Sequence, residues 1–311
     1  MTARFAWCCP QCRAPLEATS DGGLRCVAEN QTFPTEDGIR CLLGEESRRR
    51  VAAFVSDYVR VRRGEARGSD DPDYFRALPF RDLSGRHPYE WTIRARSFRA
   101  LEEMVVEPLA SGSDGPLRVA DLGAGNGWLS NRMSLAGHEV AAVDLNDDPT
   151  DGLGACCHYE SDFEAVQADF DALPFADGSL DLVVFNGSLH YSTDYRPTLR
   201  EAVRTLRSGG AVAVLDTPVY RDPGSGAAMV DELRSGFRER FGVQGDALPT
   251  RGYLTRDDLA RLAGELGLEW RESWPFYGLR WSVRPWLALL RGRREPASFG
   301  VIWAFQRGGF R

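Results

Sequence analysis

The chain has 311 residues, a length that suits about two globular domains. Hydrophobic residues make up 43% and charged residues 27%, a composition that excludes a disordered protein. No apolar run approaches the ~18 residues that a membrane-spanning helix needs, so we expect no membrane association. The first eight residues lack the apolar stretch of a secretory signal, so we expect a cytoplasmic protein whose cysteines stay reduced. Residues 111–220 hold 6 basic and 17 acidic side chains, and such an acidic middle segment would repel phosphate backbones.

Cysteines crowd the start of the chain, where residues 8–41 contain five of the seven. This odd number favours a metal cluster over disulfides. Cys9 and Cys12 form one C-x2-C pair, but the second pair is incomplete because Glu29 stands where a partner of Cys26 would be. The predicted zinc ligands are Cys9, Cys12, Cys26 and Cys41, with Cys8 and Glu29 as alternatives for the fourth position. A metal-free segment held by its apolar residues is the other interpretation.

The next segment, residues 45–90, is rich in Arg, Asp and Gly and is expected to be a helical linker or lid, with a helix around residues 51–61. Residues 91–109 carry apolar side chains at helical spacing and predict an amphipathic helix. We therefore divide the chain into residues 1–44, 45–90 and 91–311.

Strands and helices then alternate along the chain. The predicted strands are 117–122, 139–145, 165–168, 180–185, 211–215, 268–274 and 299–305, and the predicted helices are 128–136, 195–206 and 255–266. Such alternation indicates an α/β fold with a mostly parallel, doubly wound sheet covered on both faces.

The sharpest motif is the glycine loop of residues 119–128, which lies where the first of these strands turns into a helix. Gly123, Gly125 and Gly127 leave the backbone open to a close ligand, but their spacing is not that of a dinucleotide fingerprint. Asp121 would repel a pyrophosphate and suits a cationic ligand. Asp144 ends the next strand about 20 residues later, where a carboxylate can accept both ribose hydroxyls. Asp169 and Phe170 follow the third strand and suit an adenine ring.

These residues resemble the class I S-adenosylmethionine-dependent methyltransferases, specifically the small-molecule, type 11-like branch. The resemblance covers about residues 90–310 and includes the stretches L-P-F-A-D-G-S-L-D-L-V at 173–183 and L-R-E-A-V-R-T-L-R-S-G-G at 199–210. It implies a Rossmann-like sheet of order 3-2-1-4-5-7-6 with an antiparallel last strand, and S-adenosyl-L-methionine as cofactor. The implied cofactor-binding residues are Asp121, Gly123, Ala124, Gly125, Asn126, Asp144, Leu145, Asp169, Phe170, Asn186 and Tyr89.

The N-terminal cysteine segment resembles the Trm112-like zinc-ribbon modules. It also resembles the zinc module of a bacterial methyltransferase that acts on guanine N1 of large-subunit ribosomal RNA. Both resemblances imply a small zinc-ribbon-like domain over residues 1–44.

The catalytic edge is expected after the fourth strand, since in the family this segment borders the methionine end of the cofactor. His190 and Tyr191 are the catalytic candidates, with His190 either a general base or only a wall of the pocket. Tyr89 and Trp91 are expected either to fold over the cofactor or to pack against the helix. Two aromatic insertions, residues 216–253 and 274–286, are expected to build an apolar acceptor pocket or to cover the sheet edge.

The resulting hypothesis is methyl transfer to a small molecule, such as a secondary metabolite. The alternative is an RNA base methyltransferase that docks RNA on an arginine cluster formed by Arg48, Arg49, Arg50, Arg60, Arg62 and Arg63. A third hypothesis is a non-catalytic member of the fold that binds a partner. Neither the acceptor atom nor the oligomeric state can be predicted from these patterns.

Overall fold

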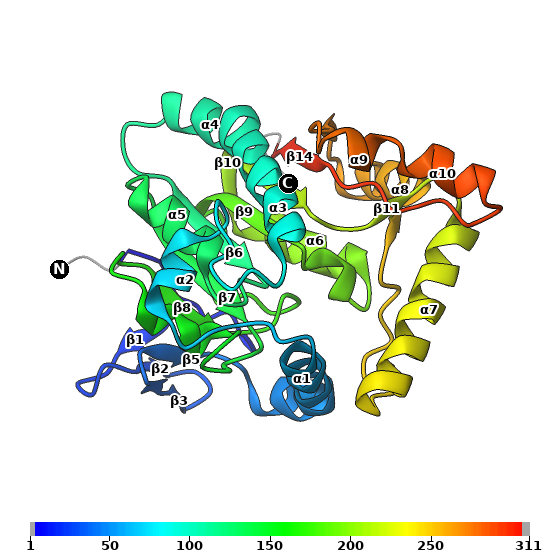
Figure 1. Ribbon diagram of the computed structural model, residues 1–311. Coiled ribbons are helices and arrows are strands. Elements are labelled where there is room, and N and C mark those ends of the chain that lie inside the picture. Colours follow the sequence, from blue (N-terminus) through cyan, green and yellow to red (C-terminus); the bar gives the residue numbers. More distant parts are fainter. Residues whose placement is uncertain (1–3, 307–311) are drawn as a thin grey trace.

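A computed structural model describes residues 4–306, which form a nine-stranded sheet covered by helices on both faces (Figure 1). The strand order is β13-β14-β10-β9-β6-β7-β8-β5-β4. The parallel central strands are β6 (Arg118–Leu122), β7 (Glu139–Asp144), β8 (Glu164–Gln167), β9 (Leu180–Asn186) and β10 (Leu206–Leu215). β14 (Val301–Phe305) runs antiparallel to β10 and to β13 (Arg271–Ser273). The seven strands from β8 to β13 confirm the order 3-2-1-4-5-7-6.

Alternate residues of the central strands enter two separate apolar layers. Val183 and Phe185 of β9 pack on the face covered by α6 (Tyr195–Thr205) and α8 (Arg256–Leu266). Leu182 and Val184 pack on the opposite face, which is covered by α3 (Pro88–Leu101) and α5 (Trp128–Leu135). Both sides of the strands are therefore dry, which explains why they read as continuous apolar runs in the sequence.

The N-terminal segment begins with a small antiparallel sheet, formed by β1 (Glu17–Ala18), β2 (Leu24–Cys26) and β3 (Gln31–Phe33). A hairpin follows, made of β4 (Thr35–Glu36) and β5 (Ile39–Cys41), and β5 pairs in parallel with β8. Phe5, Trp7 and Leu24 belong to the same apolar core as the central strands. The cysteine-rich segment thus extends the main sheet by two strands.

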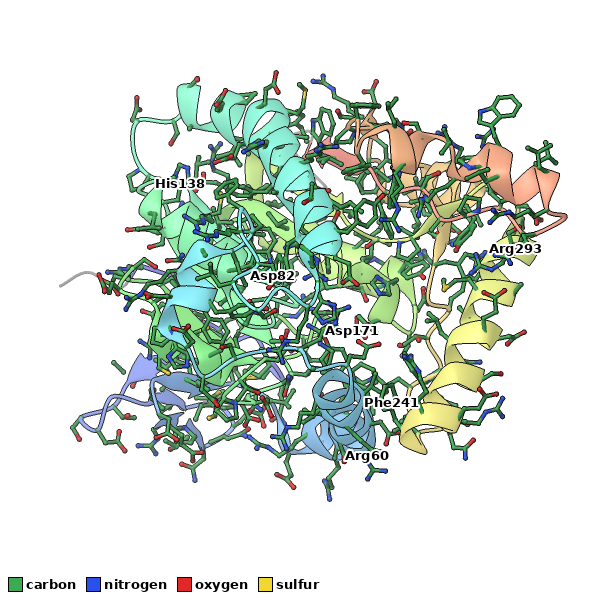
Figure 2. The ribbon with its side chains drawn as sticks, in the orientation of Figure 1. Arg60, Asp82, His138, Asp171, Phe241 and Arg293 are labelled. Carbon is green, nitrogen blue, oxygen red and sulfur yellow. The ribbon has the colours of Figure 1, made fainter. Side chains whose placement is uncertain are left out.

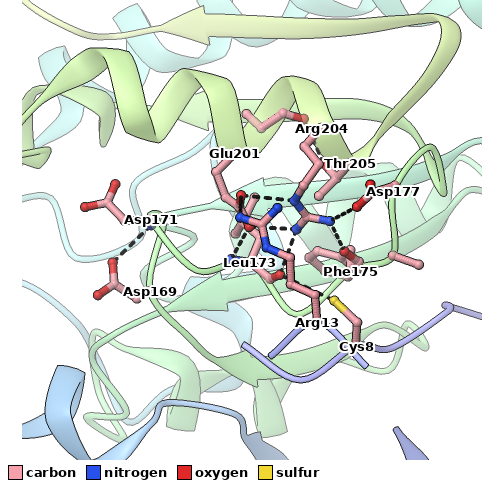
Figure 3. A network of polar contacts seen from close by, with 12 residues as sticks. Cys8, Arg13, Asp169, Asp171, Leu173, Phe175, Asp177, Glu201, Arg204 and Thr205 are labelled. Atoms are coloured by element: carbon pink, nitrogen blue, oxygen red, sulfur yellow. Dashed lines mark hydrogen bonds and ion pairs between the residues drawn. The ribbon is translucent and has the colours of Figure 1, made fainter. Parts of the chain in front are cut away.

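A buried ion-pair network joins this segment to α6 (Figure 3). Glu201 accepts hydrogen bonds from Arg204 (Nη2 to Oε1, 2.6 Å), from Arg13 (Nη2 to Oε2, 3.0 Å) and from the backbone N–H of Leu173 (3.1 Å). Arg204 also donates to the carbonyl oxygen of Phe175 at 2.8 Å. The two stretches 173–183 and 199–210 therefore recognise each other, and they hold the N-terminal segment in place.

The remaining helices lie around the sheet (Figure 1). They are α1 (Glu45–Gly64), α2 (Pro72–Ala77), α4 (Glu107–Ser111), α7 (Pro223–Phe241), α9 (Leu279–Ser282) and α10 (Arg284–Leu290). A two-stranded pair, β11 (Val219–Tyr220) with β12 (Leu254–Thr255), closes the segment around α7. Within residues 4–306, no helix has both the length and the apolarity to cross a membrane.

Several predicted boundaries were wrong, including the start of the strand placed at 211–215, which begins at Leu206. The helix placed at 51–61 runs through Glu45–Gly64, and the one placed at 91–109 begins at Pro88, because proline suits the first helical position. This second helix also changes to a π-helical turn over Glu102–Val106. The strand placed at 268–274 shrinks to Arg271–Ser273, an exposed edge strand without apolar alternation.

Candidate functional site

The glycine loop lies at the carboxyl edge of the sheet, between β6 and α5. Gly123, Gly125 and Gly127 all have positive φ angles, of 75°, 54° and 75°. A Cβ atom on Gly123 would lie 2.3 Å from the Cβ of Ser188, which follows β9. Only glycine satisfies both the φ angle and this close approach. At position 123, glycine is therefore required by the contact with Ser188 inside the protein.

The next strand supplies a carboxylate that holds the loop. Asp144 accepts hydrogen bonds from the backbone N–H groups of Gly125 and Asn146, both at 2.8 Å. Burial raises the pKa of Asp144. Each oxygen has one backbone partner and keeps a second lone pair, so the carboxylate can still accept hydrogen bonds from a ligand.

Asp121 lies under the loop and does not line its cavity. One carboxyl oxygen accepts a hydrogen bond from Ser130 Oγ at 2.8 Å, and the other has no partner among the described residues. Burial raises the pKa of Asp121 to about 7. Its contact with a ligand amino group stays a prediction.

Three adjoining cavities open along this edge, and Tyr58 and Tyr191 line all of them. The inner cavity measures about 80 Å³ and lies between α1 and the predicted residues Gly123, Asp144, Leu145, Asp169 and Phe170. The loop cavity measures about 250 Å³ and includes Gly123, Ala124, Gly125, Asn126, Asn186 and His190 in its wall. The outer cavity measures about 300 Å³ and lies between α1, α7 and the segment 243–252. Most of the predicted cofactor residues thus meet at one place.

Helix α1, which belongs to the segment 45–90 expected to be a helical linker or lid, closes the inner cavity. Phe54 and Tyr58 line the cavity, and Arg50 forms an ion pair with Asp169. Two further ion pairs fasten the helix, from Arg62 to Asp151 and from Arg63 to Asp148, with nitrogen–oxygen distances of 2.5 Å. These three arginines therefore contact acids of residues 111–220. Arg60 projects from the outer side of the helix and has no ion pair among the described residues (Figure 2).

His190 and Tyr191 lie on a short 3-10 turn, Leu189–Tyr191, directly after β9. Both line the loop cavity and the outer cavity. The Nδ1 atom of His190 is buried and has no hydrogen-bond partner among the described residues. Burial also lowers the pKa of His190 to about 4, so the imidazole is neutral at neutral pH. The Tyr191 ring packs against Phe54 and Tyr58, with ring centres 5.8 Å apart in each case.

Four charged residues line the loop cavity, and none of them was predicted as part of the cofactor site. Arg62 and Asp151 pair with each other, and the other two are Asp216 and Arg94. Asp216 ends β10 with a φ of 52°, and one carboxyl oxygen accepts a hydrogen bond from Ser97 Oγ at 2.6 Å while the other is buried without a partner. Arg94 of α3 lies 4.7 Å from the centre of the Trp91 ring and makes no ion pair within the described part of the chain. Burial lowers the pKa of Arg94. The position of Asp216 directly after a strand could have indicated a site residue. No feature of the sequence around Arg94 indicates that it lines the cavity.

Several predicted residues lie elsewhere. Tyr89 does not line the three cavities, because its ring packs 4.6 Å from the guanidinium carbon of Arg280. Trp91 is buried against Trp128, so its ring packs within the fold. The first aromatic insertion supplies walls of the loop and outer cavities, but residues 274–286 line none of the three.

The N-terminal cysteine cluster is smaller than predicted. The sulfur atoms of Cys9, Cys12 and Cys26 lie within 4.8 Å of one another, and those of Cys12 and Cys26 are 3.5 Å apart. Cys41 does not join them, because it belongs to β5 and its Sγ faces the carbonyl oxygen of Ile39 at 3.6 Å. Cys8 is also directed elsewhere, toward the carbonyl oxygen of Leu173. The structure therefore assembles three of the four predicted ligands.

Comparison with known proteins gives a consistent result. Residues 120–214 match a family described as "Methyltransferase domain". A malonyl-[acyl-carrier protein] O-methyltransferase from Erwinia pyrifoliae is 33% identical over 132 residues, which cover 41% of this chain and 47% of that protein. The enzyme of the same name from Hahella chejuensis is 35% identical over 98 residues, covering 30% and 34% of the two chains.

The chain thus spans about half the length of the Erwinia relative and about a third of the Hahella relative. Among solved structures, an S-adenosylmethionine-dependent methyltransferase from Mesorhizobium loti aligns with a TM-score of 0.46 and 20% identity, over 64% of this chain and 96% of that one. Residues 120–214 contain the glycine loop, Asp144, Asp169 and His190. Residues 120–214 of the chain therefore match a methyltransferase domain.

Proposed function

We propose that this protein transfers the methyl group of S-adenosylmethionine to a small, largely apolar acceptor that binds in the outer cavity. The observation that carries the proposal is the loop cavity, which adjoins the outer cavity. Its wall joins the glycine loop to His190 and to Arg94, which has no ion pair among the described residues. When bound, S-adenosylmethionine supplies an electrophilic methyl group. The residues of the chain have to position that group and the acceptor in line and to exclude water.

For the adenosine half of the cofactor, the inner cavity offers matching groups. Asp144 has lone pairs free for the ribose hydroxyls, and Phe170 offers an apolar wall for the adenine ring. Asp169 keeps lone pairs beside its ion pair with Arg50 and can accept from the adenine amino group. Since the inner cavity is only about 80 Å³, α1 has to move outward to admit a nucleoside.

For the methionine half, Arg94 is the residue that we assign to the carboxylate. A buried guanidinium without an ion pair is unfavourable, and a ligand carboxylate in the loop cavity would supply the missing partner. Asp216 lines the loop cavity, and its carboxyl oxygen without a partner among the described residues suits the ammonium group.

His190 is proposed to accept a hydrogen bond from the hydroxyl of the acceptor. Its ring is neutral at neutral pH, so its free nitrogen can take this hydrogen bond, and it can receive the proton as the oxygen gains the methyl group. The name O-methyltransferase, which the curated relatives carry, supports oxygen as the acceptor atom. The outer cavity, lined by apolar residues such as Val230, Leu233 and Phe237, favours an apolar molecule.

Calorimetry with Arg94→Ala tests the cofactor site. We expect S-adenosylmethionine to bind at least about tenfold more weakly, while 5′-methylthioadenosine, which lacks the carboxylate, binds as to the wild type. Arg99→Ala is the matched control, because Arg99 lies on the same helix over the Phe80 ring and lines none of the three cavities of the site. Equal loss for both ligands would reject this role of Arg94, and no binding of either by the wild type would reject the function.

Transfer itself is tested with methyl-labelled S-adenosylmethionine and extracts of the host. Label in small molecules supports the proposal, and label in RNA would favour the alternative. His190→Gln should slow transfer about a hundredfold and leave cofactor affinity unchanged.

We also propose that Cys9, Cys12 and Cys26 hold a zinc ion. Zinc–sulfur bonds of about 2.3 Å place the sulfur atoms of a tetrahedral site roughly 3.8 Å apart, which fits the observed cluster. Metal analysis of the full chain should give one zinc per molecule. Cys12→Ser should lose it and Cys41→Ser should retain it, whereas less than half an equivalent in the wild type would favour the metal-free interpretation.

A further inference from the structure

The helix pair α9–α10 shows the largest cluster of exposed apolar side chains among the described residues. Neither helix contains a buried residue. Leu279, Val283, Trp286 and Leu290 expose 77%, 43%, 70% and 82% of their surface. Leu287 and Leu289 are exposed as well. An exposed apolar cluster of this size on a soluble fold marks an interaction surface.

These four side chains form a single stripe. Their spacing of four, three and four residues places them on one face of a helix. The helical hydrogen bonds continue across the junction, from Val283 N to the Leu279 carbonyl (3.1 Å) and from Leu287 N to the Val283 carbonyl (3.0 Å). The stripe Leu279–Val283–Trp286–Leu290 is therefore continuous.

Positive charge borders the stripe. The segment 279–294 contains five arginines and no acidic residue. Arg284 donates to the carbonyl oxygen of Ala297, and Arg294 pairs with Glu232 of α7. Arg280, Arg291 and Arg293 have no ion pair within residues 4–306. Arg293 lies at the outer edge of the molecule, near the start of α7 (Figure 2).

We propose that α9–α10 docks the protein on an anionic lipid surface. The apolar stripe enters the boundary between headgroups and acyl chains, and Arg280, Arg291 and Arg293 meet lipid phosphates. This is the arrangement of an interfacial helix, with Trp and Leu on one face and arginines beside it. The expectation of no membrane contact rested on the lack of a spanning segment, which does not bear on a helix that lies in the interface.

Shape and charge favour a lipid surface over a second copy of the chain. The helix pair forms the outer border of the molecule, so a flat surface can reach it (Figure 1). A symmetric dimer through the stripe would place the arginines of both copies together, and like charges repel. The docking surface also adjoins the loop cavity, because the Trp281 ring lies 5.4 Å from the ring of Phe299, which lines that cavity.

Co-sedimentation of the full chain with vesicles tests the proposal. We expect binding to vesicles that contain phosphatidylglycerol, weak binding to phosphatidylcholine alone, and release by added salt. The double variant Trp286→Ser, Leu290→Ser should bind about tenfold more weakly. Leu135→Ser is the matched control, since Leu135 is 63% exposed on the distant helix α5. All variants should unfold at the wild-type temperature and bind S-adenosylmethionine equally, because the substituted side chains are exposed and line none of the three cavities.

Four results would overturn the proposal. They are no binding to anionic vesicles, equal loss in Leu135→Ser, a dimer that only the double variant dissociates, and stripe-dependent binding to an acidic carrier protein by a chain that ignores vesicles. The last two would assign the stripe to a second copy or to a protein partner. None of these results bears on methyl transfer, which the labelling experiment decides separately.

Discussion

Helix α1 and the helix pair α9–α10 are both rich in arginine, yet their side chains are used in opposite ways. In α1, Arg50, Arg62 and Arg63 each pair with an acid of the methyltransferase domain, and Phe54 and Tyr58 line the cavities. In α9–α10, Arg280, Arg291 and Arg293 have no ion pair among the described residues, and the apolar side chains face outward. Helix α1 is thus held over the cavities by ion pairs, whereas α9–α10 keeps its apolar side chains exposed.

The difference lies in what each helix faces. α1 crosses the most acidic part of the chain, where Asp148, Asp151 and Asp169 follow the strands. α9–α10 lies beyond the edge strands and meets few acids, of which Glu232 is already paired. An arginine count therefore does not identify a binding surface, because the same residues that look like an RNA footprint in α1 neutralise the protein's own carboxylates.

Removing one cation of α1 should cause the largest loss of stability. Arg62→Ala leaves the carboxylate of Asp151 buried without its partner, and we expect unfolding to become easier by about 3 kcal/mol. Denaturant unfolding measures this loss. The double variant Arg62→Met, Asp151→Leu should recover most of it, because no unpaired charge remains. A loss below about 0.5 kcal/mol for Arg62→Ala would show that the ion pair does not hold α1.

The titration of His190 reports how well α1 excludes water. Its pKa of about 4 lies below the ordinary 6.5, so the fold favours the neutral ring. Stability from this group is therefore present above pH 6.5 and is lost as the pH falls toward 4, by about 3 kcal/mol in total. In NMR titrations, the ring of His190 should not change above pH 5. In Arg62→Ala, an opened α1 should return the pKa of His190 toward 6.5; an unchanged value would separate the histidine from α1.

Sequence patterns were sufficient where the information is local. Buried parallel strands appear in the sequence as apolar runs. The glycine loop comes directly after one such run and Asp144 ends the next, so the strand order and the cofactor edge could be predicted. Most of the predicted cofactor residues line two neighbouring cavities for this reason.

The rest depends on contacts between distant segments. Nothing in Ile39–Cys41 indicates that this strand pairs with β8, or that Cys41 is thereby drawn away from the other cysteines. Arg94 becomes notable only because its neighbours leave it without an ion pair. For residues 274–286 an acceptor pocket and a cover for the sheet edge both remained open, because aromatic density is the same in a pocket and on an exposed surface.

Ligands should protect the two helices from trypsin independently, by a more modest amount. Trypsin cleaves after arginine, and both helices offer several sites. S-adenosylmethionine should slow cleavage in α1 about tenfold, because a filled inner cavity holds Phe54 and Tyr58 in place, and should leave cleavage after Arg291 and Arg293 unchanged. Anionic vesicles should have the reverse effect. Fragment masses over time measure both rates, and protection of both helices by one ligand would contradict their separate roles.

The smallest effect should come from arginines without partners. Arg60→Ala and Arg291→Ala remove exposed cations that make no ion pair among the described residues, so each should change the free energy of unfolding by less than about 0.5 kcal/mol. Their effects on vesicle binding should differ, however. Arg291 borders the apolar stripe and its loss should weaken binding and its salt dependence, whereas Arg60 projects from α1 and its loss should have no effect (Figure 2). Equal weakening by both variants would mean that lipid attraction follows the net charge of the whole chain and that the position of the arginine beside the stripe is irrelevant.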